Sequence, residues 1–289
     1  MPDLHWYPGH MTKAVRQMKE DIKLIDVVIE LVDARIPISS RNPDIDSLAV
    51  NKSRVIVLNK ADLADDRATE AWIKYFEEQG LIAVKLNSKN GNGIKQVKDA
   101  IAKASEAKMA RDRARGILNR PVRAIVGGIP NVGKSTFINS FAGRAVTKTG
   151  NKPGVTKGKQ WIRLNKQVEL LDTPGILWPK FEDKMTAEHL AFIGSIKDEI
   201  IEKRELAIKF ITEIEARYEG IISKYYDFEN VENNGNNIEF AMQILSLISE
   251  KRALIKKGGE ADINKASVML LDDFKNGRLG KITLENAGV

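Results

Sequence analysis

Cysteine is absent from the 289-residue sequence. Disulfide bonds and thiolate metal sites are therefore excluded, and the composition fits a reducing compartment. Long apolar runs are also missing, because no stretch approaches the ~18 uncharged residues that a membrane-spanning helix requires. No signal peptide opens the chain, so we expect a cytoplasmic protein without a membrane segment. The length and the 43% apolar residues are sufficient for two folded domains.

Acidic residues are scarce in two stretches of the chain, and the net charge is +7. Residues 103–123 contain seven Lys or Arg and two acids, and residues 144–166 contain seven Lys or Arg and no acid. Such blocks favour binding to a polyanion such as RNA, and a solvated basic surface is the alternative. A smaller basic cluster consists of Lys251, Arg252, Lys256 and Lys257. It stands at an expected helix end, where it either compensates the helix dipole or contacts RNA.

A phosphate-binding loop stands in the middle of the chain. The run Gly128-Ile129-Pro130-Asn131-Val132-Gly133-Lys134-Ser135 follows an apolar strand pattern and precedes a helical pattern, as the G-x-x-x-x-G-K-S motif requires. Its glycines let backbone N–H groups approach phosphate oxygens. We expect Lys134 to reach the β- and γ-phosphates and the Ser135 hydroxyl to bind Mg²⁺. The predicted nucleotide contacts in this loop also include Asn131, Val132, Gly133 and Thr136.

A second strand pattern ends in Asp172-Thr173-Pro174-Gly175. An aspartate at a strand end can hold the Mg²⁺ shell, and the Gly175 N–H can meet the γ-phosphate. Between this motif and the phosphate loop lies Lys152-Pro153-Gly154-Val155-Thr156. Thr156 is either a second Mg²⁺ ligand that orders its loop in the nucleoside-triphosphate state or an ordinary loop hydroxyl. Because this loop is basic, ordering it would couple the nucleotide state to binding of a polyanion.

Two short motifs at strand ends predict recognition of guanine. The first is Asn59-Lys60-Ala61-Asp62, and the second is Asn87-Ser88-Lys89. The Asp62 carboxylate can accept two hydrogen bonds from guanine, whereas adenine would leave it unpaired. We expect Lys60 and Lys89 to cover the two faces of the base and the Ser88 N–H to contact guanine O6.

Strand and helix patterns alternate over the first part of the chain and predict an α/β domain with a parallel-rich sheet and helices on both faces. The strands are expected at 26–33, 54–58, 81–86, 122–126, 159–164 and 167–171. Helical spacing marks residues 11–24, 67–79 and 93–109, followed by a linker over 111–121, and later 186–196, 197–226, 238–254 and 264–274. We therefore expect an α/β domain over 1–180, with its ligand at the carboxyl ends of the strands, and an all-α domain over 185–289.

The order of the motifs is unusual, because the base-reading motifs precede the phosphate loop, whereas in an ordinary small GTPase they follow it. The fold is therefore predicted to be circularly permuted. In this order the chain resembles the permuted GTPases of the YlqF type, also called ribosome biogenesis GTPase A. The matching segments outside the nucleotide motifs are Trp6-Tyr7-Pro8-Gly9-His10-Met11, Asp33-Ala34-Arg35-Ile36-Pro37 and Lys256-Lys257-Gly258-Gly259. The resemblance covers the whole chain.

The resemblance implies an enzyme that hydrolyses GTP to GDP and phosphate with Mg²⁺. It also implies a role in assembly of the bacterial large ribosomal subunit, with the subunit precursor and its rRNA as partners. We expect a monomer that binds the particle in its GTP state, is stimulated by it and leaves after hydrolysis. The alternatives are an RNA-binding scaffold with structural GTP and a GTP-coupled enzyme that modifies RNA or a metabolite. No second catalytic constellation is visible for the latter.

The residue that orients the attacking water is missing from its usual place. Many GTPases have a glutamine after the glycine of the DxxG motif, but here that position is Ile176, which cannot bond water. We expect His10, which follows the Pro8-Gly9 turn, to act in hydrolysis, and the alternative is packing or RNA contact. In related GTPases an asparagine at the position of Asn131 helps to hold K⁺, and the alternative is a role in loop geometry.

Overall fold

The computed structural model describes residues 20–117, 120–147, 160–163, 168–172, 183–196 and 202–288. The chain divides into two compact units. The first contains the residues up to Thr186 together with a short C-terminal segment that begins at Glu285, and the second is Ala187–Leu284. The chain thus leaves the first unit, builds the second and returns to the first for its last few residues.

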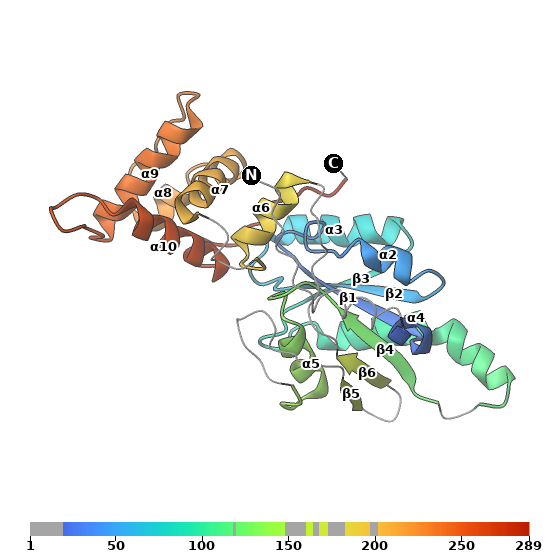
Figure 1. The fold of residues 1–289 in the computed structure, drawn as a ribbon. Coiled ribbons are helices and arrows are strands. Elements are labelled where there is room, and N and C mark those ends of the chain that lie inside the picture. Colours follow the sequence, from blue (N-terminus) through green and yellow to red (C-terminus); the bar gives the residue numbers. More distant parts are fainter. Residues whose placement is uncertain are drawn as a thin grey trace. The chain divides into compact units, whose positions relative to one another are not determined.

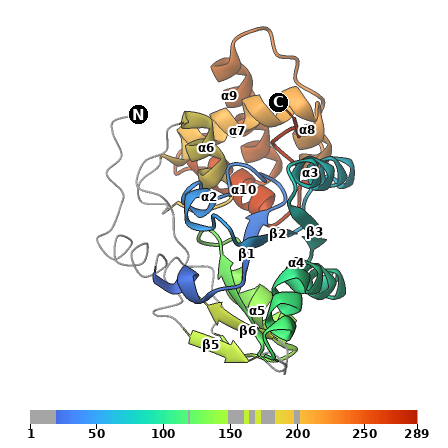
Figure 2. The same cartoon turned by 90° about the vertical axis from the view of Figure 1, so that its right-hand side faces the viewer.

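A six-stranded sheet forms the centre of the first unit, with the strand order β3-β2-β1-β4-β6-β5. Neighbouring strands pair in parallel, except that β5 runs antiparallel to β6. The strands are β1 (Val27–Asp33), β2 (Ser53–Asn59), β3 (Ile82–Leu86), β4 (Val122–Gly127), β5 (Gln160–Arg163) and β6 (Val168–Asp172). The strands β3 and β5 form opposite edges (Figure 2). This sheet confirms the predicted parallel-rich α/β class.

Helices cover both faces of the sheet. They are α2 (Asp44–Leu48), α3 (Asp66–Glu78), α4 (Ile94–Ala114) and α5 (Lys134–Ala142), and the 3₁₀ turn η1 (Ile22–Leu24) precedes β1. Figure 1 shows α2 and α3 on one face and α4 and α5 on the other. Because it is covered on both sides, the central strand β1 is buried along its whole length. This burial explains its nearly continuous apolar sequence.

The helix α3 illustrates how the apolar spacing of the sequence builds the core. Trp72 and Phe76 lie one turn apart, so they share a face of the helix. Both pack in one cluster with Ile56 and Leu58, which lie two residues apart and therefore point to the same face of β2. Asp65 caps the helix by accepting the Ala68 N–H at 2.8 Å.

The helix α4 is longer than the sequence predicts. A helix over 93–109 and a linker over 111–121 are expected, whereas the structure continues the helix to Ala114. The buried residues of α4 all lie before residue 106 and are Val97, Ala100, Ile101, Ala104 and Ser105. Residues 106–114 are therefore helical without a buried face. These residues are Ala, Lys, Arg, Met and Glu with a single Asp, and this composition favours a helix even without packing. The prediction of a linker from residue 111 did not take this helix propensity into account.

The second unit is built from helices. They are α6 (Lys184–Phe192), which begins in the first unit, α7 (Lys203–Arg217), α8 (Ile221–Tyr226), α9 (Asn237–Lys251) and α10 (Ile263–Lys275). Three aromatic rings pack at its centre, with centroids 5.3 Å apart for Phe192 and Phe210 and 4.7 Å apart for Phe210 and Phe274. None of the described helices is both long and apolar enough to cross a membrane.

The expected helix over 197–226 is interrupted between α7 and α8. Gly220, which directly precedes α8, adopts a left-handed backbone with φ of 72°, a conformation that glycine adopts without steric cost. The Glu215 carboxylate accepts the Gly220 N–H at 2.6 Å and the Ile222 N–H at 3.1 Å, so it supports the turn from within α7. The apolar spacing runs across this break and conceals it. The expected helix over 11–24 lies largely outside the described residues, and its end is the turn η1.

Candidate nucleotide-binding site

The turn between β4 and α5 has a backbone that requires glycine at two positions. A Cβ atom on Gly128 would lie 2.8 Å from the Leu31 carbonyl oxygen and 2.9 Å from Val132 Cγ1. Gly133 has φ of +99°, and a Cβ atom there would lie 2.6 Å from Asn59 Nδ2. Both glycines of the motif are therefore explained by close approach of neighbouring atoms, and Gly133 also by its backbone angle.

Helix α5 begins at Lys134, directly after this turn, and no side chain caps its N-terminus. The N–H groups of a first helical turn have no acceptor within the helix, and the helix dipole places a partial positive charge there. Lys134 is buried, and Ser135 and Thr136 are half-buried. A turn of this kind, with a lysine at the helix start, is suited to binding phosphate oxygens.

Asn59 joins three loops at the carboxyl ends of the strands. It ends β2, where the sheet register places it beside Asp33 of β1 and Leu86 of β3. Its Nδ2 donates to the Val132 carbonyl oxygen at 2.8 Å. Its Oδ1 accepts from the Ser88 N–H at 3.1 Å and from the Ser88 hydroxyl at 2.6 Å. This buried side chain thus ties segment 59–62 to the phosphate loop and to segment 87–89.

Lys60 makes a second link to the phosphate loop. Its ammonium group donates to the Asn131 carbonyl oxygen at 2.8 Å. Both residues adopt the left-handed backbone region, with φ of 58° at Lys60 and 62° at Asn131. Asparagine tolerates this region better than lysine does, and such strain persists only where surrounding contacts hold it. The backbone of Asn131 therefore shapes the phosphate loop, and binding of K⁺ by its side chain stays a prediction.

The Ser88 N–H is engaged differently from the expectation. The sequence assigns it to guanine O6, whereas in the structure it donates to Asn59. The reason is the register, because Leu86 pairs with Asn59 and Ser88 follows two residues later. The predicted contact of Ser88 with O6 would have to replace this bond. The exposed Lys89 donates its N–H to Asn87 Oδ1 at 2.9 Å, which shapes the same turn.

The remaining two residues of the first base-reading motif lie at the same edge of the sheet. The Ala61 N–H donates to the Leu86 carbonyl oxygen at 3.1 Å, which holds the motif against the end of β3. The Asp62 side chain is exposed. An exposed carboxylate next to this edge is able to accept hydrogen bonds from a bound base, as the sequence predicts.

Asp33 and Arg35 form part of the site, although the sequence alone assigns them no role. Asp33 ends the central strand, and its side chain is completely buried. Its Oδ1 accepts from Arg35 Nε at 2.9 Å, its Oδ2 accepts from Arg35 Nη2 at 2.9 Å, and Lys60 Nζ lies 3.0 Å from Oδ2. The signal that could have identified them is the position of an acid at the end of a strand that neighbours the strand ending in Asn59.

Charge balance in this buried group sets its protonation. Burial raises the pKa of Asp33, but the charges of Arg35 and Lys60 outweigh burial and hold the pKa well below its usual range. The carboxylate is therefore ionised at neutral pH. Burial lowers the pKa of Lys60, and the Asp33 carboxylate offsets part of that effect while Arg35 adds to it.

Two of the three predicted magnesium ligands, Ser135 and Asp172, fall on described elements next to the phosphate loop. Ser135 follows the buried lysine at the start of α5, and Asp172 ends β6. The register pairs Asp172 with Val126, close to the end of β4 where the phosphate loop begins. Hydroxyl and carboxylate oxygens, together with phosphate oxygens, are the kinds of ligand that Mg²⁺ prefers. Thr156, Gly175 and His10 lie outside the described residues.

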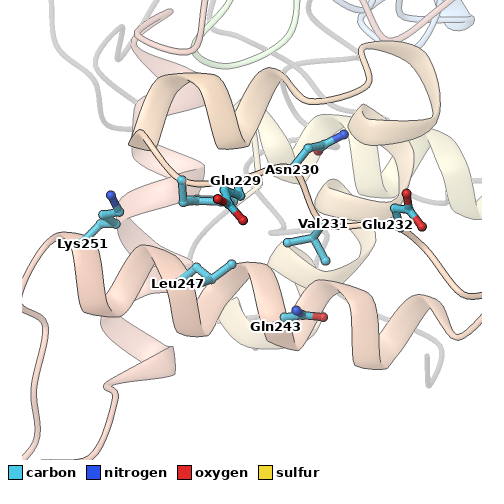
Figure 3. A pocket seen from close by; sticks show the side chains of 8 residues that line it. Glu229, Asn230, Val231, Glu232, Gln243, Leu247 and Lys251 are labelled. Carbon is cyan, nitrogen blue, oxygen red and sulfur yellow. The ribbon is translucent and has the colours of Figure 1, made fainter.

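A separate hollow in the second unit does not match a nucleotide. It has a volume of about 500 Å³ and lies between the segment after α8 and one side of α9 (Figure 3). Its lining residues are Phe228, Glu229, Asn230, Val231, Glu232, Gln243, Leu247 and Lys251. Two carboxylates and one ammonium group make a poor environment for a triphosphate, which is itself an anion. None of the nucleotide motifs contributes to it.

The geometry defines a class of protein. At the carboxyl ends of the parallel strands, the phosphate loop after β4 meets two base-reading segments, which follow β2 and β3. The base-reading segments nevertheless come first in the chain. This is the arrangement of a circularly permuted P-loop GTPase.

Comparisons with known proteins agree with this class. A family model described as MMR_HSR1, 50S ribosome-binding GTPase, matches residues 123–243. The chain is 45% identical to the ribosome biogenesis GTPase A of Bacillus cereus, over 98% of this chain and 93% of that protein. It is 33% identical to the protein of that name from Thermotoga maritima, over 98% and 94% of the two chains.

Solved structures show the same likeness. The crystal structure of GNP-bound YlqF from Thermotoga maritima matches with a TM-score of 0.66 and 28% identity, covering 96% of this chain and 99% of that chain. A GDP-bound YlqF structure matches with a TM-score of 0.65 and 27% identity, covering 94% and 99%. The chain belongs to the ribosome biogenesis GTPase A family. It is a GTPase that binds GTP and GDP.

Gly133 leaves no room for a side chain beside Asn59, so a substitution there should change the affinity for nucleotide. We expect Gly133→Ala to weaken GDP binding by about 10-fold or more, because the new methyl group would displace the Asn59 side chain that positions the loops. Gly143→Ala is the matched control, since Gly143 ends the same helix with φ of +65° and a Cβ there would meet nothing within 4 Å. Equilibrium titration with a fluorescent GDP derivative measures both. Equal affinities for the two variants would contradict the assignment.

Proposed function

We propose that the protein binds precursors of the large ribosomal subunit in its GTP state, promotes a late step of their assembly and leaves after hydrolysis. Membership in a family named for ribosome biogenesis carries this proposal. The proposal includes contact with rRNA, a monomeric protein and a location in the cytoplasm. It also includes stimulation of hydrolysis by the particle.

The surface of α4 supports the part of the proposal that concerns RNA. Residues 106–114 of this helix include no buried residue. They and the turn after them carry the exposed side chains of Arg111, Arg113 and Arg115. Lys108 pairs with Asp112, so part of the basic charge in this segment is already balanced. A helix that ends in arginines without a packing role is suited to phosphate contacts. The second basic block, 144–166, lies mostly outside the described residues.

Sedimentation of the protein with large-subunit precursors tests the proposal. We expect more protein to pellet with a non-hydrolysable GTP analogue than with GDP, because the proposed switch orders a basic loop in the GTP state. Binding should fall steeply as salt rises, because phosphate contacts release counterions. Equal pelleting in the two nucleotide states would exclude the switch. If the particle fails to stimulate hydrolysis although binding occurs, an RNA-binding scaffold with structural GTP would be the better description.

The same sedimentation assay tests the helix α4. We expect replacement of Arg111, Arg113 and Arg115 by Gln to weaken particle binding and to reduce its salt dependence, with GDP affinity unchanged. Replacement of Arg67 and Lys74 by Gln is the control, because both are exposed basic residues of α3. If the control set weakens binding as much per charge removed, the contact is general electrostatics and α4 is not the surface.

We propose that His10 acts in the stimulated hydrolysis, because Ile176 cannot orient the attacking water. His10→Ala should then lower single-turnover hydrolysis at saturating particle by about 10²-fold or more, the scale of a positioned acid–base group. Nucleotide affinity and docking of the analogue-bound protein should be retained. His5→Ala is the matched control, since His5 precedes the same Trp-Tyr-Pro-Gly sequence that His10 follows. An undiminished rate for His10→Ala would end the catalytic assignment.

Mg²⁺ and K⁺ complete the proposed chemistry. We propose Ser135, Asp172 and Thr156 as Mg²⁺ ligands and Asn131 as a residue that helps to hold K⁺. Hydrolysis should then be faster in potassium than in sodium at equal ionic strength. The Asn131→Gly variant should hydrolyse GTP at the same rate in both salts. Glycine is chosen because it retains the positive φ of this position and removes only the side chain. A parent protein with the same rate in both salts would contradict the role of K⁺.

A further inference from the structure

Asp33 is a buried acid of the first unit that is linked to the phosphate loop by Lys60. Asp33 is completely buried at the end of the central strand. Taking a carboxylate out of water is costly unless it is paired and hydrogen-bonded. The fold pairs it twice, with Arg35 through two hydrogen bonds of 2.9 Å and with Lys60 at 3.0 Å.

The lysine that receives this charge is shared between Asp33 and the phosphate loop. The Lys60 ammonium group lies 3.0 Å from Asp33 Oδ2 and 2.8 Å from the Asn131 carbonyl oxygen. It follows Asn59 directly and has a left-handed backbone. A lysine stem is flexible, with substantial rotamer entropy to lose when it is held in one place. Two oxygen acceptors on opposite loops restrict its head group to one position.

The loop that presents Asp33 is itself held at several points. The Asp33 N–H donates to Ser40 Oγ at 2.9 Å, which closes the loop over residues 33–40. Glu285, in the returning C-terminal segment, accepts the Ile38 N–H at 2.6 Å and the Ser39 N–H at 3.0 Å. The C-terminal segment therefore braces this loop from outside.

The same C-terminal segment packs on an apolar cluster that the base-reading motif also contacts. The Glu285 carbonyl oxygen accepts from Trp72 Nε1 at 3.2 Å. Ala287 packs against the apolar cluster around Trp72 and Phe76, and Ala61 of the base-reading motif packs against that cluster too. Residues 285–287 therefore support the loop with Asp33 directly, and they pack on the same apolar cluster as Ala61, which follows Lys60.

We propose that Asp33 is a positioning residue for nucleotide binding, which holds the Lys60 ammonium group against the phosphate loop and so keeps the base-reading segment in place. This inference rests on the proposed role of Asn59-Lys60-Ala61-Asp62 in reading the base. Asp33 touches neither nucleotide nor metal in this account, and it acts through Lys60. Glu285 supports the same arrangement by bracing the loop that carries Asp33.

The test is a double-mutant cycle on the dissociation rate of a fluorescent GDP derivative. Asp33→Asn keeps the size of the side chain and removes its charge, and Lys60→Met keeps the stem and removes the ammonium group. We expect each single variant to release GDP about 10-fold faster, and the double variant to release it no faster than Lys60→Met alone, because coupled residues are not additive. A merely structural role for Asp33 would give effects that multiply.

Glu30→Gln is the matched control for loss of a buried charge. Glu30 lies on the same strand, is equally buried and pairs with Arg41 and Arg54. None of these three belongs to the nucleotide motifs, so its variant should lower the urea midpoint while leaving GDP release unchanged. If Asp33→Asn does not fold, Glu285→Ala replaces it in the cycle, because it loosens the same loop without leaving a buried cation unpaired.

The results of these measurements distinguish the positioning role of Asp33 from the role of Lys60 in nucleotide binding. Multiplying effects in the cycle, or a Glu30→Gln variant that releases GDP as fast as Asp33→Asn, would overturn the role of Asp33. With Glu285→Ala in the cycle, a release rate equal to that of the parent protein would do the same. A Lys60→Met variant that releases GDP at the parent rate would instead remove the role of Lys60 itself, and the proposal for Asp33 with it.

Discussion

The side chain of Asn59 makes three hydrogen bonds to two other loops, and the rest of the nucleotide site depends on them. Its amide group has one donating side and one accepting side. The donating side meets the carbonyl oxygen of Val132 in the phosphate loop, and the accepting side meets the N–H and hydroxyl of Ser88. Gly133 must lack a side chain because Asn59 occupies that space. One buried amide thus explains a glycine, a serine and the spacing of three loops.

The parallel sheet brings the loops that Asn59 connects close together, and the site therefore does not depend on the order of the motifs in the chain. Strands β1, β2, β3, β4 and β6 are parallel, so their carboxyl ends lie at one edge. A segment that follows any of these strands reaches the same place, whether it comes early or late in the sequence. Circular permutation therefore changes where the chain begins and leaves the site intact.

Much of the fold and the site could be predicted from sequence, because strand-end motifs carry strong local signals. Apolar runs that end in glycine, asparagine or aspartate predict where the strands stop. They locate the phosphate loop, the base-reading segments and the strand β6, which ends at Asp172. Long-range partners could not be predicted in this way. Asp33 and Arg35 meet Lys60 only after β1 and β2 have paired, and Glu285 reaches residues 38 and 39 from the far end of the chain. Apolar spacing also failed to reveal the break at Gly220, where a glutamate holds the turn.

The central claim is that Asn59 holds the loops of the nucleotide site together, and GDP release from an Asn59→Ala variant tests it most directly. Each buried partner left without a hydrogen bond costs about 1–3 kcal/mol, so release should be at least about 10-fold faster than in the parent protein. Asn42→Ala is the control, because Asn42 is also buried and its side chain accepts the Asp44 N–H, away from the nucleotide motifs. Faster release from Asn59→Ala with unchanged release from Asn42→Ala is the predicted result. Release at the parent rate from a folded Asn59→Ala variant would contradict the account.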